Sequence, residues 1–216
     1  MFSGSSPFSD YVDTTFLLVV GVSLLVLVGL LIAMVSFVIR YSRSKNPHPS
    51  NIEGNIPLEI TWTVIPLVLF MGMFYLGWRG YLQEKTAPDN AVLIKVTARM
   101  WAWSFTYPNG VTADTLYVPV GTPVALTLHS LDVNHSFYIP AFRIKRDVIP
   151  NRENQMWFRT NRAASYDIAC AEYCGLNHSY MSSKVVSKDS AAFESWYKDA
   201  SEKQSKPYRP LTAASL

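Results

Sequence analysis

The sequence lacks any charged residue over residues 14–39, and it has no lysine or arginine before Arg40. An uncharged run of this length exceeds the roughly 20 apolar residues that cross a membrane. The missing basic flank and the length of the run both argue against a cleaved secretory signal. A second uncharged run covers residues 60–78. The sequence therefore predicts a transmembrane hairpin whose helices span residues 14–39 and 58–82.

Basic residues are also missing from the leader, residues 1–13, which carries two acids, whereas the connector, residues 40–57, carries three basic residues against one acid. Basic connectors remain on the cytoplasmic side of a membrane, so we expect the leader and everything after Arg79 to face outward. The Ser- and Pro-rich leader should hold no core. The predicted location is a bacterial inner membrane, crossed twice, with the C-terminal domain on the periplasmic face.

Long hydrophobic runs are absent beyond a linker at residues 86–90, where short runs rich in Val, Thr, Tyr and Trp alternate with Pro, Gly and Asn. Such runs are typical of strands. They predict an all-β sandwich or barrel over residues 90–200, with a helix capped by Asp189 and a loose tail over residues 201–216. The expected strands are residues 91–98, 115–118, 123–128, 155–160 and 165–169.

Cysteine is scarce: only two cysteines occur, and no Cys-x-x-Cys-His motif is present, which excludes covalent haem attachment through that motif. Cys170 and Cys174 share one short segment with His178 and Met181. In an exported domain, a disulfide is the ordinary alternative for such a pair. Thiolates, an imidazole and a thioether suit copper, and a single-copper centre uses one cysteine. Two cysteines therefore favour two coppers that share bridging thiolates.

A second histidine ligand must come from elsewhere, and the chain has four histidines in all. His48 lies in the expected cytoplasmic connector. His129 follows the alternation of a predicted strand, which indicates a structural or surface histidine. His135 follows the same strand, in the kind of loop that closes a copper site. We therefore take His135 as the second candidate ligand.

These residues resemble the dinuclear copper A centre of cytochrome c oxidase subunit II, whose pattern is Cys-x-Glu-x-Cys-Gly-x-x-His-x-x-Met after a distant His. The likeness runs from the first spanning helix to about residue 198. It implies a cupredoxin domain in which the two cysteines bridge two copper ions and each histidine ligates one copper. It further implies a weak methionine ligand, a backbone carbonyl ligand, and a magnesium site that the glutamate shares with subunit I. The six positions are His135, Cys170, Glu172, Cys174, His178 and Met181.

Three other segments resemble the same family. Glu59, at the start of the second spanning helix, matches a glutamate near the mouth of a proton path, although a helix cap or a membrane anchor would also account for it. Trp101 opens an aromatic segment and matches the tryptophan that receives electrons, although aromatic residues commonly serve in packing. Residues 144–152 resemble a stretch near the copper site, with Asn151 in place of the usual glycine, a replacement that left-handed backbone tolerates.

The resemblance implies an electron-accepting subunit that passes electrons from a c-type cytochrome to the haem of subunit I, where oxygen is reduced to water. The expected partners are subunit I, other oxidase subunits, the cytochrome and the membrane, without nucleic acid. Alternatives are a quinol oxidase subunit II, which lacks the copper ligands, a membrane-anchored copper-delivery protein, and an adhesion domain with a plain disulfide.

Acidic residues are fewer than expected for docking a basic soluble cytochrome. From residue 90 onward the chain has 14 lysines and arginines against 10 acids. Thr106, Asn109 and Leu131 stand where the family usually has acids, which leaves Asp114 and Asp132. Steered association requires complementary fields. We therefore expect a tethered or permanently bound c-type cytochrome, or one held in a supercomplex.

Overall fold

The computed structural model describes residues 4–48, 50–51 and 53–205. The chain forms two compact units: Tyr11–Leu82, and a second unit that combines Met1–Asp10 with Gln83–Leu216. The first unit is a helical hairpin, and the second is a β-sandwich with one helix. This arrangement confirms the predicted fold class.

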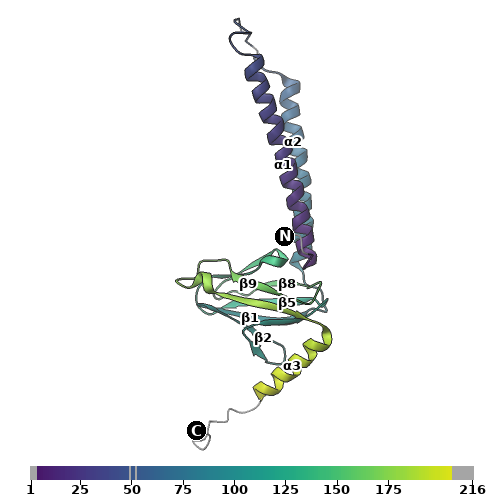
Figure 1. Ribbon diagram of the computed structural model, residues 1–216, viewed down its shortest axis with the longest axis vertical. Coiled ribbons are helices and arrows are strands. Elements are labelled where there is room, and N and C mark those ends of the chain that lie inside the picture. The colour runs from purple at the N-terminus through teal and green to yellow at the C-terminus, as the bar shows by residue number, and fades with distance from the viewer. Residues whose placement is uncertain (1–3, 49, 52, 206–216) are drawn as a thin grey trace, which may run out of the picture. The chain divides into compact units, whose positions relative to one another are not determined.

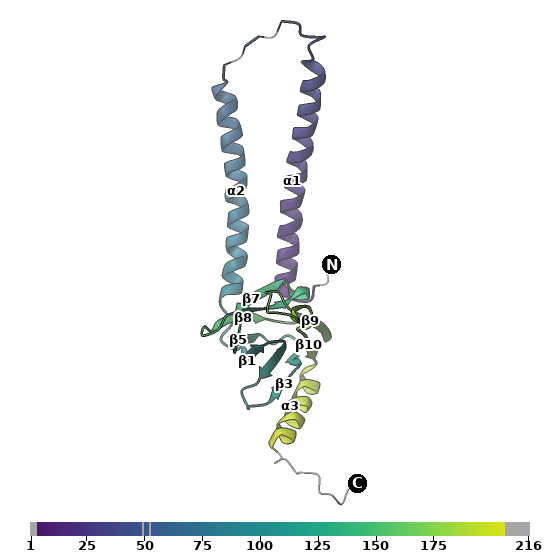
Figure 2. The ribbon, with the colours of Figure 1, turned by 90° about the vertical axis from the view of Figure 1, so that its left-hand side faces the viewer.

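The hairpin consists of α1 (Pro7–Arg40) and α2 (Ile56–Lys85), which Figure 2 shows side by side with the connector at one end. Both helices are long and apolar enough to cross a membrane. The Tyr11 hydroxyl donates a hydrogen bond to the Leu76 carbonyl, and a Cβ built on Gly80 would overlap the Tyr11 ring. Only glycine at position 80 therefore allows α1 and α2 to approach here.

α1 begins at Pro7, well before the expected start at residue 14, because the leader contains its own cap. Ser6 Oγ accepts the Phe8 N–H (3.4 Å), and Ser9 Oγ accepts the Ser6 N–H (3.3 Å). This reciprocal pair is a capping box, and proline suits the first helical position. The leader is therefore largely helical.

The expectation that the leader holds no core is also wrong. Phe8 is 7% exposed and packs edge-on against Trp157, with 4.8 Å between ring centroids. Asn161 donates from its backbone N–H to the Ser5 carbonyl (3.1 Å) and from Nδ2 to the Gly4 carbonyl (2.9 Å). Residues 4–10, which we call the N-terminal strap, are thus part of the second unit and lie on the same side of the membrane as its β-sandwich.

A cysteine introduced at Ser44, an exposed residue of the connector, should react with reagents that reach only the cytoplasmic side. Both helices are long and apolar enough to span, and a connector with more lysine and arginine than acids is expected on the inner side. Labelling of intact cells with impermeant and permeant maleimides measures this. Ser165→Cys, on the exposed surface of the sandwich, is the control and should react from outside. Reaction of Ser44→Cys with the impermeant reagent would reverse the topology.

The sandwich has two five-stranded sheets, visible as two layers in Figure 1. In the first sheet β1 pairs parallel with β5 and antiparallel with β2. In the second sheet β9 lies between β6 and β10 and pairs antiparallel with both. The first sheet, in spatial order, is β3 (Thr112–Ala113), β2 (Ala102–Thr106), β1 (Val92–Arg99), β5 (Val124–Ser130) and β8 (Asn154–Phe158). The second is β4 (Leu116–Pro119), β10 (Ser182–Lys188), β9 (Ala164–Cys170), β6 (His135–Ile139) and β7 (Ile144–Val148).

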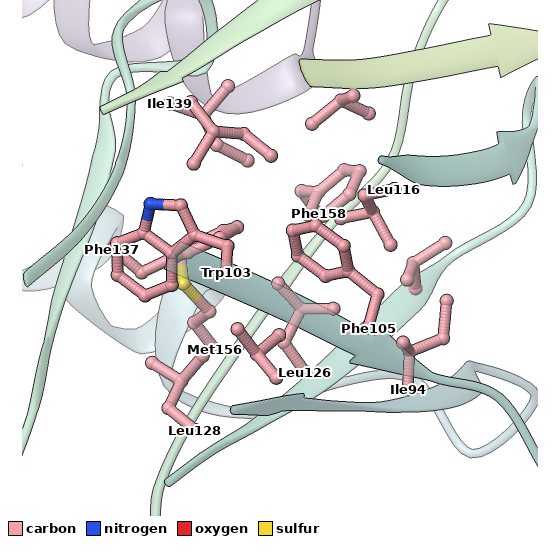
Figure 3. Close-up of a cluster of buried hydrophobic side chains, with 14 of the residues drawn as sticks. Ile94, Trp103, Phe105, Leu116, Leu126, Leu128, Phe137, Ile139, Met156 and Phe158 are labelled. Carbon is pink, nitrogen blue, oxygen red and sulfur yellow. The ribbon is translucent and has the colours of Figure 1, made fainter. Parts of the chain in front are cut away.

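Alternating side chains of the two sheets meet in one core. Figure 3 shows Trp103 beside Phe137, and Phe105 beside Phe158, in its interior. The Trp103 and Phe137 rings are edge-on, with 5.1 Å between centroids. Trp103 also lies edge-on to His135 at 6.1 Å, so the core extends directly to a candidate ligand.

The five expected strands correspond to β1, β4, β5, β8 and β9, but five others were not predicted. The sequence gives them weak signals: β7 carries three consecutive charged residues, and β10 is mainly serine and lysine. β7 pairs with its chain neighbour β6, and β10 pairs with the distant strand β4 as well as with β9; this pairing overrides local propensity.

A third helix, α3 (Ser190–Ser205), covers one end of the sandwich. Asp189 accepts the Phe193 N–H through its carbonyl, as expected for a cap position. The helix runs into the residues expected as a tail, because Gln204 exchanges two hydrogen bonds with the Thr112 backbone (3.1 and 2.6 Å) and seals the edge strand β3. Residues 206–216 of that tail lie outside the described residues.

Candidate metal centre

Strand pairing brings the first two candidate ligands together. Cys170 is the last residue of β9, and His135 is the first residue of β6, two positions from Phe137, which pairs with Cys170. The Ala171 N–H donates to the Ser136 carbonyl (2.9 Å), and the Cys170 N–H donates to the Met181 carbonyl (3.1 Å). These bonds fold the loop of residues 171–181 back over the end of the sheet.

The loop brings four more groups to the same point. Cys170 Sγ lies 3.8 Å from Cys174 Sγ, 3.9 Å from His135 Nδ1 and 3.2 Å from the Glu172 carbonyl oxygen. Cys174 Sγ lies 3.5 Å from His178 Nδ1 and 3.6 Å from Met181 Sδ. The six expected positions therefore converge, with each imidazole beside a different sulfur.

Both cysteines are free and buried. Their sulfur separation of 3.8 Å is far beyond the roughly 2.0 Å of a disulfide bond. Burial, reinforced by the neighbouring Cys170, raises the pKa of the Cys174 thiol. Without a metal the thiol is therefore protonated at neutral pH, and binding of a metal must release its proton.

Asp132 holds the His135 ring on the side away from the cysteines. Its side chain is fully buried, and Nε2 lies 2.8 Å from Asp132 Oδ1, which leaves Nδ1 for the sulfur side. Burial alone would raise the pKa of Asp132, but hydrogen bonds from His135 and from the N–H groups of Met100 (2.6 Å) and Val133 (2.7 Å) lower it. The sequence suggested Asp132 only as a surface acid, and its support of His135 was not predicted.

Asp132→Ala should weaken copper binding by about 10–100-fold, because a carboxylate behind a ligating imidazole fixes its orientation and raises its basicity. Competition with a copper chelator measures this. Asp114→Ala is the matched control, since Asp114 is an exposed acid outside the cluster, and it should bind copper like the unmodified protein. Equal affinities for both variants would contradict a supporting role for Asp132.

Trp101 packs on the cysteine loop. It is half-buried, and its Nε1 is buried without a partner among the described residues. A Cβ built on Gly175 would lie 3.4 Å from the Trp101 ring, and Gly175 has φ +113°, so both space and backbone favour glycine here. Gly175 occurs in the predicted pattern, but its contact with Trp101 was not foreseen.

Glu59, His129 and the side chain of Glu172 lie outside this cluster. Glu59 is exposed and belongs to the hairpin, where its carboxylate accepts the Asn55 N–H (3.3 Å) while Asn55 Oδ1 accepts the Leu58 N–H (3.1 Å). This is a helix cap. His129 lies half-buried on β5, in the other sheet. The side chain of Glu172 is exposed, and only its carbonyl points to Cys170.

The chain matches two family profiles, "Cytochrome C oxidase subunit II, transmembrane domain" over residues 2–76 and "Cytochrome C oxidase subunit II, periplasmic domain" over residues 111–188. Three relatives named cytochrome c oxidase subunit 2 come from different bacteria. The protein of Alkalihalophilus pseudofirmus is 32% identical over 90% of this chain and 60% of its own length. Those of Cereibacter sphaeroides and Thermostichus vulcanus are 29% and 30% identical, over 86% and 76% of this chain and 74% and 67% of theirs.

Among solved structures, the periplasmic domain of subunit II of cytochrome oxidase from Bradyrhizobium japonicum is similar over 55% of this chain and 99% of its own, with 29% identity and a TM-score of 0.52. A chain of a heme-copper terminal oxidase dimer shares the fold, with 22% identity and a TM-score of 0.51 over 61% of this chain and 99% of its own. The present chain spans only about 60% of the Alkalihalophilus relative.

Proposed function

Because this chain belongs to the cytochrome c oxidase subunit II family, we propose that it is the electron-accepting copper subunit of a haem-copper terminal oxidase. It receives electrons from a c-type cytochrome and passes them to the haem of subunit I, which reduces oxygen to water. The observation that carries this proposal is the convergence of two free thiols, two imidazoles, a thioether and a carbonyl at the end of one sheet. That donor set suits copper.

Cys170 and Cys174 would hold the two copper ions of the proposed centre together, with His135, His178 and, more weakly, Met181 as further ligands. Glu172 contributes its backbone carbonyl. The bridged pair would supply a one-electron carrier whose charge is shared by both metals. The protein contributes rigidity: strand pairing fixes Cys170, and Asp132 fixes the His135 ring. The exposed Glu172 carboxylate is free to join a magnesium site with subunit I, as in the family.

Two observations weigh against a copper-delivery protein. The thiols are buried, and His135 is fully buried, whereas delivery requires ligands that a recipient can reach. A quinol oxidase subunit would have no use for the six donors. A bacterial inner membrane is the location expected from the bacterial relatives, and the charge bias of the connector places the copper domain outside.

Purification of the tagged chain from membranes in mild detergent tests the proposal. We expect a haem-containing subunit to co-purify, two coppers per chain, and oxygen consumption driven by a reduced c-type cytochrome. Retention of copper against a competing chelator separates this role from delivery, for which copper should leave readily.

Glu59→Gln separates proton uptake from helix capping at that residue. The glutamine Oε1 still accepts the Asn55 N–H, so the cap should survive, but the side chain no longer titrates. If Glu59 opens a proton path, turnover of the assembled oxidase should fall by about tenfold with unchanged copper content. Glu53→Gln, in the connector before α2, is the control. Unchanged turnover in Glu59→Gln would leave only the capping role.

A further inference from the structure

A cavity of about 100 Å³ lies on the outer face of the first sheet. It is lined by Lys85 at the end of α2, by the linker that follows, and by β1, β5 and β8, which are neighbours in the sheet (Figure 1). Leu93, its residue on β1, lies roughly 20 Å along the strand from Arg99, the end that adjoins the metal cluster. The cavity is therefore separate from the metal centre.

Two rows of outward-facing side chains cross the three strands at this cavity. The register of β1 with β5, and of β5 with β8, places the members of each row opposite one another. The residues between the rows point into the core, as alternation along a strand requires. The apolar row consists of Leu93, Ala125 and Trp157. The polar row consists of Lys95, Thr127 and Gln155, of which the last two line the cavity.

Positive charge at the cavity is not matched by an acid. The described residues that line it include no aspartate or glutamate, and Lys85 makes no ion pair with any described residue. Glu84, the acid next to Lys85 in the sequence, lies 3.6 Å from Arg146 Nη2. Lys95 adds a second exposed cation at the end of the polar row. The site therefore favours an anion.

Trp157 adds a hydrogen-bond donor to this wall. Its ring packs edge-on against Phe8 of the N-terminal strap, and its Nε1–H is buried without an acceptor among the described residues. A buried N–H without a partner is unfavourable, so an oxygen atom of a ligand beside the ring would be stabilised. The Thr127 hydroxyl and the Gln155 amide can donate to further oxygens. Several donors around one small space suit a phosphate group.

Both spanning helices reach this part of the domain over a short length of chain. Lys85 is seven residues beyond Trp78, where the second charge-free run ends, which is roughly 10 Å along a helix. Phe8, the neighbour of Trp157, is six residues before the first run begins. Lipid headgroups occupy the layer just outside the hydrocarbon core. The cavity is thus within reach of headgroups of the outer leaflet.

We propose that this cavity binds one anionic phospholipid. Lys85, Lys95 and the polar row hold the headgroup phosphate, and the apolar row contacts the glycerol and the first methylene groups of the acyl chains. A free phosphate ion has the same phosphate chemistry, but it gains nothing from Leu93, which is 64% exposed beside the polar row. The inference is independent of the proposed electron transfer, because no residue of the metal cluster takes part.

Native mass spectrometry of the full chain in mild detergent, titrated with phosphatidylglycerol, tests this inference. We expect one phosphatidylglycerol per chain, bound more tightly than phosphatidylcholine, whose headgroup has no net charge. Lys85→Gln and Lys95→Gln should each weaken phosphatidylglycerol binding by about fivefold, the usual contribution of one lysine to binding of anionic lipid. Lys198→Gln, an exposed lysine of α3, is the matched control and should bind like the unmodified chain.

Two further variants separate the roles of the rows. Trp157→Phe keeps a ring against Phe8 but removes the N–H donor, so phosphatidylglycerol binding should weaken while thermal unfolding stays cooperative. Leu93→Ser should weaken phosphatidylglycerol binding by removing the apolar contact. Inorganic phosphate should not displace the lipid at similar concentrations. If Lys85→Gln does not accumulate in the membrane, Lys95→Gln and Trp157→Phe carry the same test.

Four outcomes would overturn the inference. Displacement of phosphatidylglycerol by inorganic phosphate at similar concentrations would assign the cavity to a free anion. Equal binding of phosphatidylcholine would indicate unselective lipid contact. Equal weakening by Lys198→Gln would indicate a general attraction between charges. Unchanged phosphatidylglycerol binding in the lysine and tryptophan variants, or none in the unmodified chain, would remove the site.

Discussion

Replacing Cys170 or Cys174 with serine is expected to abolish the electron paramagnetic resonance signal of one unpaired electron shared between two copper nuclei. The two sulfurs lie 3.8 Å apart between the two halves of the cluster: Cys170 lies near His135 and the Glu172 carbonyl, and Cys174 lies near His178 and Met181. Loss of either sulfur breaks the bridge, and serine oxygen is a poor copper bridge because it is hard and weakly acidic. The remaining donors can hold at most one copper.

Met181→Leu is the matched control for the cysteine variants. Met181 Sδ lies near Cys174 alone, and a thioether is a weak, distant ligand in copper electron-transfer sites. We expect this variant to keep the shared signal with a shifted reduction potential. A signal of one isolated copper in the unmodified chain would contradict the dinuclear assignment.

The full chain is the right material for this measurement, because the β-sandwich alone is incomplete. Residues 90–198 include the ligands but not the N-terminal strap, whose Phe8 packs on Trp157 and whose Gly4 and Ser5 bind Asn161. Truncation of Phe8 to alanine removes a ring that is 7% exposed, and substitutions of this kind destabilise by about 3–5 kcal/mol when the ring is fully buried. In a fragment without the strap, the effect of lost packing on copper binding would not be separable from the effect of the cysteine substitution.

The sequence allowed the two long apolar helices and the convergence of the six candidate positions to be predicted for simple physical reasons. A charge-free apolar run of spanning length is stable chiefly inside a bilayer, and Cys170, Cys174, His178 and Met181 lie within one short loop, so their spacing reflects their geometry. Backbone pairing over a long separation was not visible. Asn161 bonds Gly4 across 157 positions, and nothing in the serine-rich leader signals a partner.

At the site, the role of Asp132 likewise could not be predicted from the sequence. From sequence it is an acid near a candidate histidine, suited to a landing surface. The turn after β5 instead aims its carboxylate at His135 Nε2 and at two backbone N–H groups. A count of charges along the chain treats every acid as a free negative charge. In the structure the Asp132 carboxylate is bonded to His135 and to two backbone N–H groups, so it contributes little to the charge of the surface.

Trp101→Ala is expected to slow electron transfer from a bound c-type cytochrome by about 100-fold or more, equivalent to at least about 2.7 kcal/mol of barrier, while the copper spectrum stays intact. The Trp101 ring packs on the cysteine loop at Gly175, so its removal opens a gap between donor and cluster. None of the cluster contacts involves Trp101, which is why the copper signal should persist. Trp101→Phe keeps an aromatic ring, so its electron-transfer rate should lie between the rates of the unmodified protein and of Trp101→Ala.

Flash-initiated electron transfer within the intact complex measures the Trp101 effect, at low and high salt. The unmodified rate should change little with ionic strength, because the domain beyond residue 90 carries more bases than acids. Trp196→Phe, on α3 at another part of the sandwich, is the control for Trp101→Phe and should transfer electrons normally. A normal rate in Trp101→Ala would remove this residue from the path. Fast oxidation of a free basic cytochrome that collapses as salt rises would show that an acidic field, supplied by another subunit, governs the encounter.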